Sequence, residues 1–504
     1  MPTVEERLAR TEAAIAALRE RNEMLAQENR WLKDQIFGRS SEKRTAPVVG
    51  HQPYLFNEAE ALGETTAEER VQVPAHSRAK RGRKPIKDTL PRVEIVHDLA
   101  DDEKVCPHDG TPLVKVGEEP SEQTDYVPAT LRVLRHIRYK YGCPCCKGFM
   151  KTAAKPEQIL PKSNATPSLL AQVTTAKYVD GMPLYRQQAQ FARLGLELPR
   201  ATMANWIVKL GTVSVIPIIN LLNEQMLDGP LIHCDETRVQ VLKSDRAPTA
   251  EHWMWVRAGG LPGKNILLFD YDPSRGADVV RRLFAGYDGI LVSDGHGPYD
   301  KVAAEFGLVH GGCLVHARRY FDRARKKMPE APERAAAALD FFTRLYRIEK
   351  QLKARDPTPT PEEWLAVRRE KSKPVMDAFK AWLEDIASRL PPKSPLGEAV
   401  NYTLGQWKKL TVFLDNPIVP LDNNRAENAI RPFVEGRKAW LFCHAQAGAR
   451  ASANLYSLAE SAKANGVEPF AYFRYLYTHL PRASTVDDFE ALLPWNAKTV
   501  IAQN

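Results

Sequence analysis

The sequence has no long apolar run. Its longest nearly apolar stretch, 213–222 (VSVIPIINLL), contains Pro217 and Asn220, whereas a helix that spans a bilayer needs about 20 consecutive apolar residues. The N-terminal stretch MPTVEERLAR mixes acidic and basic residues and is amphipathic, unlike the basic and then apolar start of a secretory signal. We therefore expect a cytoplasmic protein with no membrane association.

Cysteine is also scarce, with 7 in 504 residues. An odd number in a long chain without a secretory signal argues against a disulfide framework and leaves metal binding open. No G-x-x-x-x-G-K-S/T loop occurs, so ATP hydrolysis of that type is unsupported. What the chain does have is positive charge, a formal net +9, which fits a polyanionic partner or simply a basic protein.

Residues 1–40 carry a heptad repeat. Apolar side chains, with two asparagines and Thr11 among them, recur at the a and d positions between residues 4 and 36, which is the narrow seam of a leucine-zipper coiled coil. Asn22 and Asn29 lie at a positions, where asparagine gives up stability for register and favours a pair of helices. The pattern predicts a homodimer or higher homo-oligomer. The alternative is one amphipathic helix packed on its own domain.

Residues 41–90 have the composition of a linker with a basic segment. The segment 78–87 (RAKRGRKPIK) holds six basic residues and no acid. An extended Arg-Gly-Arg stretch can lie in a narrow minor groove, where arginines meet enhanced negative potential. The alternative is a solvated, charged linker. The candidate DNA contacts here are Lys80, Arg81, Arg83 and Lys84.

Residues 91–160 predict a zinc-binding domain. A C-x-x-C pair spans 143–146, a spacing that lets two thiolates bind one tetrahedral zinc. The upstream half is irregular, because Asp109 stands where a second cysteine is expected, and the fourth ligand stays open. The alternative is a set of free, buried cysteines. The candidate Zn²⁺ ligands are Cys106, His108, Cys143 and Cys146.

The rest of the chain alternates between helical and strand-like patterns. Residues 161–225 resemble a helix-turn-helix in spacing, although any helical hairpin has a similar pattern. Residues 226–328 contain short strand-like runs with one helix between the third and fourth, which indicates a mixed sheet. Residues 329–412 look like a helical insertion, 413–460 resume the α/β layer, and 461–504 are helical. The fold class expected is multidomain α/β plus α.

Three acids stand out against this pattern. Asp235 lies inside an apolar strand, which disfavours Asp; Asp294 ends another strand; Glu427 lies near the start of a helix. A strand interior, a strand end and a helix can place three acids around one point. Mg²⁺ or Mn²⁺ wants such oxygens, and two such ions can clamp the attacking and leaving oxygens of a phosphodiester.

Each acid also has a structural alternative. Asp235 could pair with a nearby Arg or Lys, Asp294 could be an ordinary turn residue, and the spacing from Asn424 to Glu427 fits a capping box. Asn424, Glu427, Asn428 and Arg431 nevertheless share one helical face, which suits phosphate handling. The segment 315–327 (VHARRYFDRARKK) predicts a charged helix that faces DNA.

These motifs, in this order, resemble a bacterial DDE transposase of the insertion-sequence sixty-six family over nearly the whole chain. The resemblance is carried by IFGRSSEK, CPHDGTPL with YGCPCC, HCDETRVQV, LVSDGHGPYD, GCLVHARRYF, LDNNRAENAIRPFVEGRKAWLF and LLPWN. It implies a ribonuclease-H-like (retroviral-integrase-like) catalytic core with a helical insertion. It also implies that Asp235, Asp294 and Glu427 are the acidic triad.

The resemblance further implies Mg²⁺-dependent cleavage of double-stranded DNA at element ends, followed by strand transfer into target DNA. Arg431, Arg437 and Lys438 would contact DNA. Accessory proteins of the same element and a place at the bacterial nucleoid are implied as well. Two other functions stay open: a zinc-containing DNA-binding protein without catalysis, and a ribonuclease-H-like nuclease that only hydrolyses.

Overall fold

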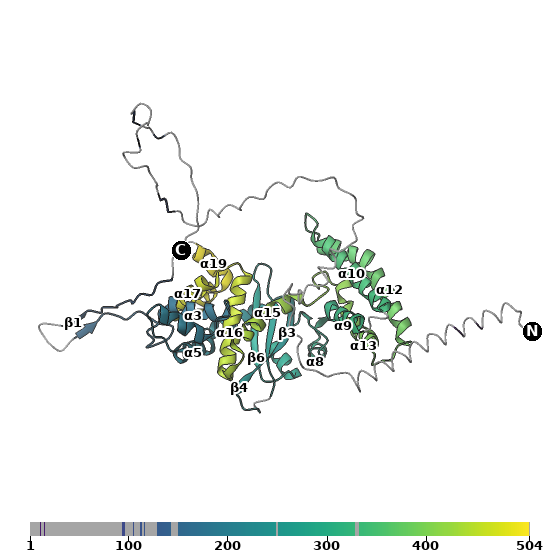
Figure 1. Ribbon diagram of the computed structural model, residues 1–504, viewed down its shortest axis with the longest axis horizontal. Coiled ribbons are helices and arrows are strands. Elements are labelled where there is room, and N and C mark those ends of the chain that lie inside the picture. The colour runs from purple at the N-terminus through teal and green to yellow at the C-terminus, as the bar shows by residue number, and fades with distance from the viewer. Residues whose placement is uncertain are drawn as a thin grey trace, which may run out of the picture. The chain divides into compact units, whose positions relative to one another are not determined.

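A computed structural model of the chain describes residues 129–142, 150–247, 250–327 and 332–502, with isolated positions before 129. The zipper, apart from the helical Thr11 and Ile15, lies outside the described residues, as do the basic segment and the four candidate zinc ligands. The chain divides into two units, 67–136 and the remainder. The helices and strands below, shown in Figure 1, belong to the second of these.

A mixed sheet of five strands forms the centre of this unit, in the order β6-β5-β3-β7-β8. β3, β5 and β6 are antiparallel neighbours, whereas β7 and β8 run parallel to β3. Parallel neighbours need crossover connections, and α7 (Ala277–Leu283) and α8 (Gly297–Phe306) lie in them. The predicted mixed sheet is confirmed. The strands are β3 (Leu231–Val239), β5 (His252–Gly259), β6 (Ile266–Asp272), β7 (Ile290–Val292) and β8 (Val309–Gly311).

Two long helices lie against one region of the sheet (Figure 1). α15 (Asn424–Trp440) packs on β3 and β5, and α16 (Gln446–Ala464) packs along β6. Between them β9 (Cys443–Ala445) pairs in parallel with β4 (Val241–Lys243). This packing brings Glu427, the catalytic candidate on α15, close to β3, the central strand of the sheet, although the two are far apart in sequence.

The free edge of β6 is closed by serines of α16. Ser461 Oγ accepts a hydrogen bond from Leu267 N at 3.0 Å, and Ser457 Oγ accepts one from Phe269 N at 2.7 Å. Alternate N–H groups of an edge strand point outward, so two serines one helical turn apart can meet two residues of the strand. Covering the edge in this way prevents pairing with another chain.

Ser457→Ala is expected to lower the free energy of unfolding by about 1–3 kcal/mol, because the buried Phe269 N–H loses its acceptor. Urea unfolding measures the change. Ser388→Ala is the matched control, since Ser388 is exposed. Equal unfolding midpoints for the two variants would contradict the role given to Ser457.

The helices before the sheet include the predicted hairpin. α4 (Leu184–Arg193) and α5 (Arg200–Lys209) are joined by a short turn, as predicted, with Trp206 buried and Asn205 exposed. They are flanked by α3 (Pro167–Tyr178), η2 (Leu210–Ser214) and α6 (Ile216–Leu227). No single described helix is both long enough and apolar enough to cross a membrane. The bent pair 200–214 and 216–227 meets these two criteria only when its helices are taken together.

The helical pattern predicted for 329–412 is present between β8 and α15. These helices and α9 (Leu314–Lys327) enclose a second core, in which Phe321, Phe342 and Phe379 are buried against one another. Figure 1 shows α9, α10, α12 and α13 gathered beside the strands. The elements are α10 (Glu333–Lys353), α11 (Pro361–Val367), η3 (Arg368–Ser372), α12 (Lys373–Ala387), α13 (Pro395–Gly405), α14 (Trp407–Leu410) and η4 (Val412–Leu414).

Short elements complete the described chain. β1 and β2 form an antiparallel pair before α3, and the helices after α16 pack on α3 and α16. Their bounds are β1 (Lys140–Gly142), β2 (Met150–Thr152), α17 (Pro469–His479), η5 (Leu480–Arg482), α18 (Val486–Ala491) and α19 (Pro494–Ala502).

Candidate active site

Asp235 lies in the middle of β3, a strand paired on both sides. Beside it, Asn423 ties the start of α15 to the strand, since its Nδ2 donates to the Cys234 carbonyl at 2.8 Å and its Oδ1 lies 2.9 Å from His233 Nδ1. Both Asn423 and His233 are buried. This clamp fixes the first turn of α15 next to Asp235, and Glu427 lies in that turn.

The other two predicted acids act electrostatically on Asp235. Burial raises the pKa of Asp235 well above its usual value, and the charges of Glu236, Glu427 and Asp294 raise it further. Like charges disfavour ionisation only when they lie close together. Asp294, just after β7, and Glu427, on α15, therefore lie near enough to Asp235 for their charges to act on it, and we call these three residues the acid cluster.

Asp294 follows β7 and has two roles. Its Oδ1 accepts a hydrogen bond from the His296 backbone N at 2.9 Å, which is the turn interaction considered for it from sequence. Its charge nevertheless raises the pKa of both Asp235 and Glu236. The turn sets the position of the carboxylate without removing it from the cluster.

Glu427 is almost fully enclosed, with its side chain 2% exposed. Arg319 Nη2 lies 2.7 Å from its Oε2, and His316 Nδ1 lies 3.5 Å from its Oε1. The capping-box alternative is wrong, because the N-cap residue is Asn423 and makes no side-chain cap bond. The single polar face predicted for α15 is divided, since Glu427 is buried and Arg431 exposed.

A fourth acid, Glu236, occupies the opposite side of β3. Its carboxylate accepts hydrogen bonds from Arg275 Nε at 2.7 Å and from the Tyr299 hydroxyl. Burial, followed by the charge of Asp294, raises its pKa. From sequence, Asp235 is the β3 acid that could pair with an arginine. Among the residues that the structure describes, Glu236 makes that pair, with Arg275.

Sequence reasoning missed His316 and Arg319. The segment 315–327 was predicted to face DNA as a charged helix, but the start of α9 is directed at Glu427, and the exposed basic side chains are at its far end, such as Lys326. The signal that could have found them is the i, i+3 spacing of His316 and Arg319, which places both on one helical face.

The three DNA-contact candidates on α15 differ in exposure. Arg431 and Lys438 are exposed, and Arg431 Nε pairs with Glu435 at 2.9 Å. Arg437 is half-buried, its Nη1 lies 3.4 Å from Thr237 Oγ1, and burial lowers its pKa. Arg431 and Lys438 are therefore accessible to a phosphate backbone, while Arg437 lies against β3.

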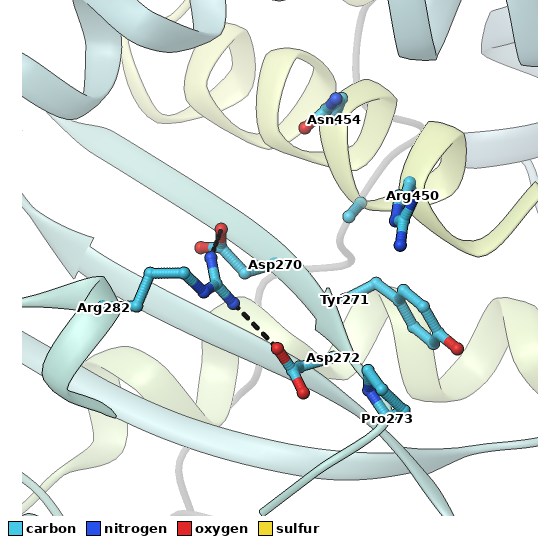
Figure 2. A pocket seen from close by; sticks show the side chains of 8 residues that line it. Asp270, Tyr271, Asp272, Pro273, Arg282, Arg450 and Asn454 are labelled. Carbon is cyan, nitrogen blue, oxygen red and sulfur yellow. Dashed lines mark hydrogen bonds and ion pairs between the residues drawn. The ribbon is translucent and has the colours of Figure 1, made fainter. Parts of the chain in front are cut away.

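A cavity of about 350 Å³ lies at the end of β6, away from the three acids. Figure 2 shows Arg282 reaching Asp272 across its floor, with Arg450 and Asn454 above them on α16. Its charged groups largely pair with one another; the Arg282–Asp272 distance is 3.0 Å. The acid cluster, not this cavity, is the candidate active site.

Comparisons with known proteins agree over most of the chain. Family models described as "Transposase IS66 family", "zinc-finger binding domain of transposase IS66", "IS66 C-terminal element" and "Transposase C of IS166 homeodomain" match residues 162–451, 103–147, 457–495 and 24–95. The chain is 30% identical to uncharacterized protein y4qI of Sinorhizobium fredii, covering 98% of this chain and 94% of that one. It is also 30% identical to uncharacterized protein y4jD of the same organism, over 81% of each.

Proposed function

The chain belongs to the IS66 transposase family, and from this membership we propose that it cuts double-stranded DNA at the ends of its element and joins those ends to target DNA. The observation that carries the proposal is electrostatic: burial, and then the charges of Glu236, Glu427 and Asp294, raise the pKa of Asp235. Asp235, Asp294 and Glu427 are the proposed catalytic triad.

We propose a ribonuclease-H-like core for this site. The support is the sheet itself: three antiparallel strands continue into two parallel ones on the other side of β3. Asp235 lies on β3, Asp294 lies just after β7, and Glu427 lies on α15, the helix that follows the insertion. The helices from α10 to α14 are then an insertion into the catalytic domain.

The residues of the cluster fit a hard divalent cation. Partly or wholly buried carboxylates that repel one another are stabilised by a cation with oxygen ligands. Glu427 Oε1, which lies 3.5 Å from His316 Nδ1, is buried without a hydrogen-bond partner. Asp235, Asp294 and Glu427 would hold Mg²⁺ or Mn²⁺, which when bound supplies Lewis acidity and a nucleophile at neutral pH. Arg319 orients Glu427, and Asn423 sets the distance between α15 and β3.

The remaining proposals fall on residues outside the described part of the chain. The coiled coil at 1–40 would pair two protomers, which suits a reaction that holds two DNA ends. Zn²⁺ would be bound within the zinc-finger match at 103–147, and the basic segment 78–87 would contact DNA. The protein would be associated with the nucleoid and would work with accessory proteins of its element. The residues concerned are Cys106, His108, Cys143, Cys146, Lys80, Arg81, Arg83 and Lys84.

A strand-transfer assay with the full chain and labelled element-end duplex, in Mg²⁺ or Mn²⁺, tests the function. We expect cleaved ends and joined products, both lost in Asp294→Asn and kept in Asp278→Asn, whose side chain is 95% exposed. A nuclease that only hydrolyses gives cleaved ends without joining. A non-catalytic DNA-binding protein retains the duplex and forms neither product.

Replacing Arg431 and Lys438 by alanine is expected to weaken DNA binding at all sequences and to lower the salt slope of log K by about 1 for each phosphate that is no longer neutralised. Both side chains are exposed on the helix that carries Glu427. DNA affinity titrated against salt measures the slope. Lys380→Ala, an exposed lysine of the insertion, is the control, and an unchanged slope in the double variant would refute the contact.

A further inference from the structure

A second set of metal ligands adjoins the acid cluster. Cys313, His316 and Glu427 each offer one ligand atom, and these atoms lie within 4.8 Å of one another. Cys313 immediately precedes α9 and His316 lies in its first turn, so the C-x-x-H spacing puts both on one side of the helix start. Glu427 comes from α15. Nothing in the proposed cleavage reaction requires the cysteine or the histidine.

Two atoms of this set make no hydrogen bond. His316 Nδ1 and Glu427 Oε1 are both buried without a hydrogen-bond partner, and they lie 3.5 Å apart. Arg319 occupies the other oxygen of Glu427 at 2.7 Å, which leaves Oε1 turned toward the imidazole. Buried polar atoms of this kind are uncommon in folded proteins. A metal ion between them would satisfy both.

The distances suit zinc. Zn–N and Zn–O bonds of about 2.0–2.2 Å in tetrahedral geometry separate the nitrogen from the oxygen by about 3.4 Å, close to the 3.5 Å between His316 and Glu427. A Zn–S bond of about 2.3 Å separates sulfur from the other ligands by about 3.6 Å. Since the ligand atoms lie within 4.8 Å of one another, the Cys313 sulfur has to approach the other two by about 1.2 Å at most.

The chemistry of the ligands points the same way. Thiolate and imidazole select zinc among the common biological cations, whereas Mg²⁺ prefers an octahedron of oxygens. The Asn423 backbone N–H donates to Cys313 Sγ at 3.2 Å, which holds the sulfur in place. Three protein ligands leave a fourth position for water.

We propose that Cys313, His316 and Glu427 bind one Zn²⁺ ion, and that this ion draws Glu427 away from the divalent-cation site and so inhibits DNA cleavage. Binding replaces the thiol proton, which is released to solvent. The ligand set stands independently of the proposed function, whereas the inhibition rests on it.

Metal stoichiometry of the full chain tests the ligand set. Co²⁺ is the probe, because its thiolate complexes absorb in the near ultraviolet, and Zn²⁺ displaces it. We expect Cys313→Ser and His316→Gln each to bind one equivalent fewer than the wild type. Cys443→Ser, which replaces another buried cysteine, should bind as many as the wild type.

Metal bound elsewhere in the chain does not disturb this measurement. Zinc bound at 103–147 contributes equally to all four proteins, so only the difference in stoichiometry counts. Circular dichroism verifies that each variant is folded, and two variants at different ligands keep the test valid if one of them is not. Wild-type stoichiometry in both folded variants would overturn the site.

Cleavage assays test the inhibition. In Mg²⁺, added Zn²⁺ should slow cleavage by the wild type at least 10-fold more than cleavage by Cys313→Ser. Loss of the thiolate ligand weakens Zn²⁺ binding, and each loss of about 1.4 kcal/mol of binding free energy lowers the affinity tenfold. Equal inhibition of the two proteins would overturn this half of the proposal. If no protein cleaves DNA in Mg²⁺, the proposed function fails, while the stoichiometry still decides the ligand set.

Discussion

Asp235→Asn is expected to abolish DNA cleavage and joining, and at the same time to make the metal-free protein more stable. Losing a ligand carboxylate removes several kcal/mol of transition-state stabilisation, or about 10³-fold or more in rate. The free energy of unfolding should rise by about 1–2 kcal/mol, because residues placed for function commonly destabilise the fold and replacing them relieves that cost. Asn keeps the Oδ1 that accepts from the Glu236 N–H at 2.9 Å.

The gain in stability should depend on pH in one direction. The folded-state pKa of Asp235 is raised, first by burial and then by Glu236, Glu427 and Asp294, so folding favours the protonated acid. The contribution of Asp235 to the stability of the wild type is therefore fully present at low pH and is lost as the pH rises through the raised pKa. Asn does not ionise, and the difference between variant and wild type grows with pH.

Urea unfolding in EDTA at a series of pH values, together with the strand-transfer assay, measures both effects. Asp278→Asn, at an exposed position, should leave activity and stability close to wild type. Residual cleavage by Asp235→Asn in Mg²⁺ would remove Asp235 from the triad. A variant less stable than the wild type at neutral pH would show that the carboxylate is stabilised by a partner.

The strands could be predicted from the sequence because their signals are local. Short apolar runs with turns between them mark β3, β5, β6, β7 and β8 without any knowledge of what they contact. Asp235 and Asp294 were visible for the same reason, since an acid within or just after such a run is unusual. Their mutual proximity is a prediction from their places in a strand and at a strand end, and the charge of Asp294 acts on Asp235 in the direction that proximity requires.

The surroundings of Glu427 could not be predicted in this way. His316 and Arg319 reach it from more than 100 residues away, and in sequence they belong to a segment whose many basic residues suggest a DNA-facing helix. The capping box was a local interpretation of Asn424 and Glu427 that packing overrides. The C-x-x-H pair at 313–316 is likewise not recognisable as a metal site in the sequence, because its third ligand lies on another helix.

The insertion is coupled to this site through backbone and core. The Leu314 N–H at the start of α9 donates to the Leu421 carbonyl just before α15, at 2.9 Å. Leu314, Leu421 and Cys313 belong to the core that the insertion helices enclose. The distance between His316 and Glu427 is thus set partly by packing inside the insertion, and a defect there should reach the site.

Arg368→Met is expected to lower the free energy of unfolding by about 3–5 kcal/mol, because it leaves a buried carboxylate without its counter-charge. Arg368 is 1% exposed. Its Nε and Nη2 lie 2.8 and 2.9 Å from the two oxygens of Glu349, and its Nη1 donates to the carbonyls of Phe413 and Asn416. One guanidinium therefore joins α10, η3 and the segment around η4.

Adding Glu349→Leu to Arg368→Met should recover part of that loss, since an apolar pair of similar volume leaves no buried charge. Tryptophan fluorescence during urea unfolding measures the cycle; Trp364, Trp382 and Trp407 report on the insertion. Lys380→Met breaks an exposed pair with Glu384 and should change stability by less than about 1 kcal/mol. If the single variant were as stable as this control, the pair would not hold the insertion. If Arg368→Met is destabilised as expected, DNA cleavage should fall with it, because the packing that sets His316 against Glu427 loosens.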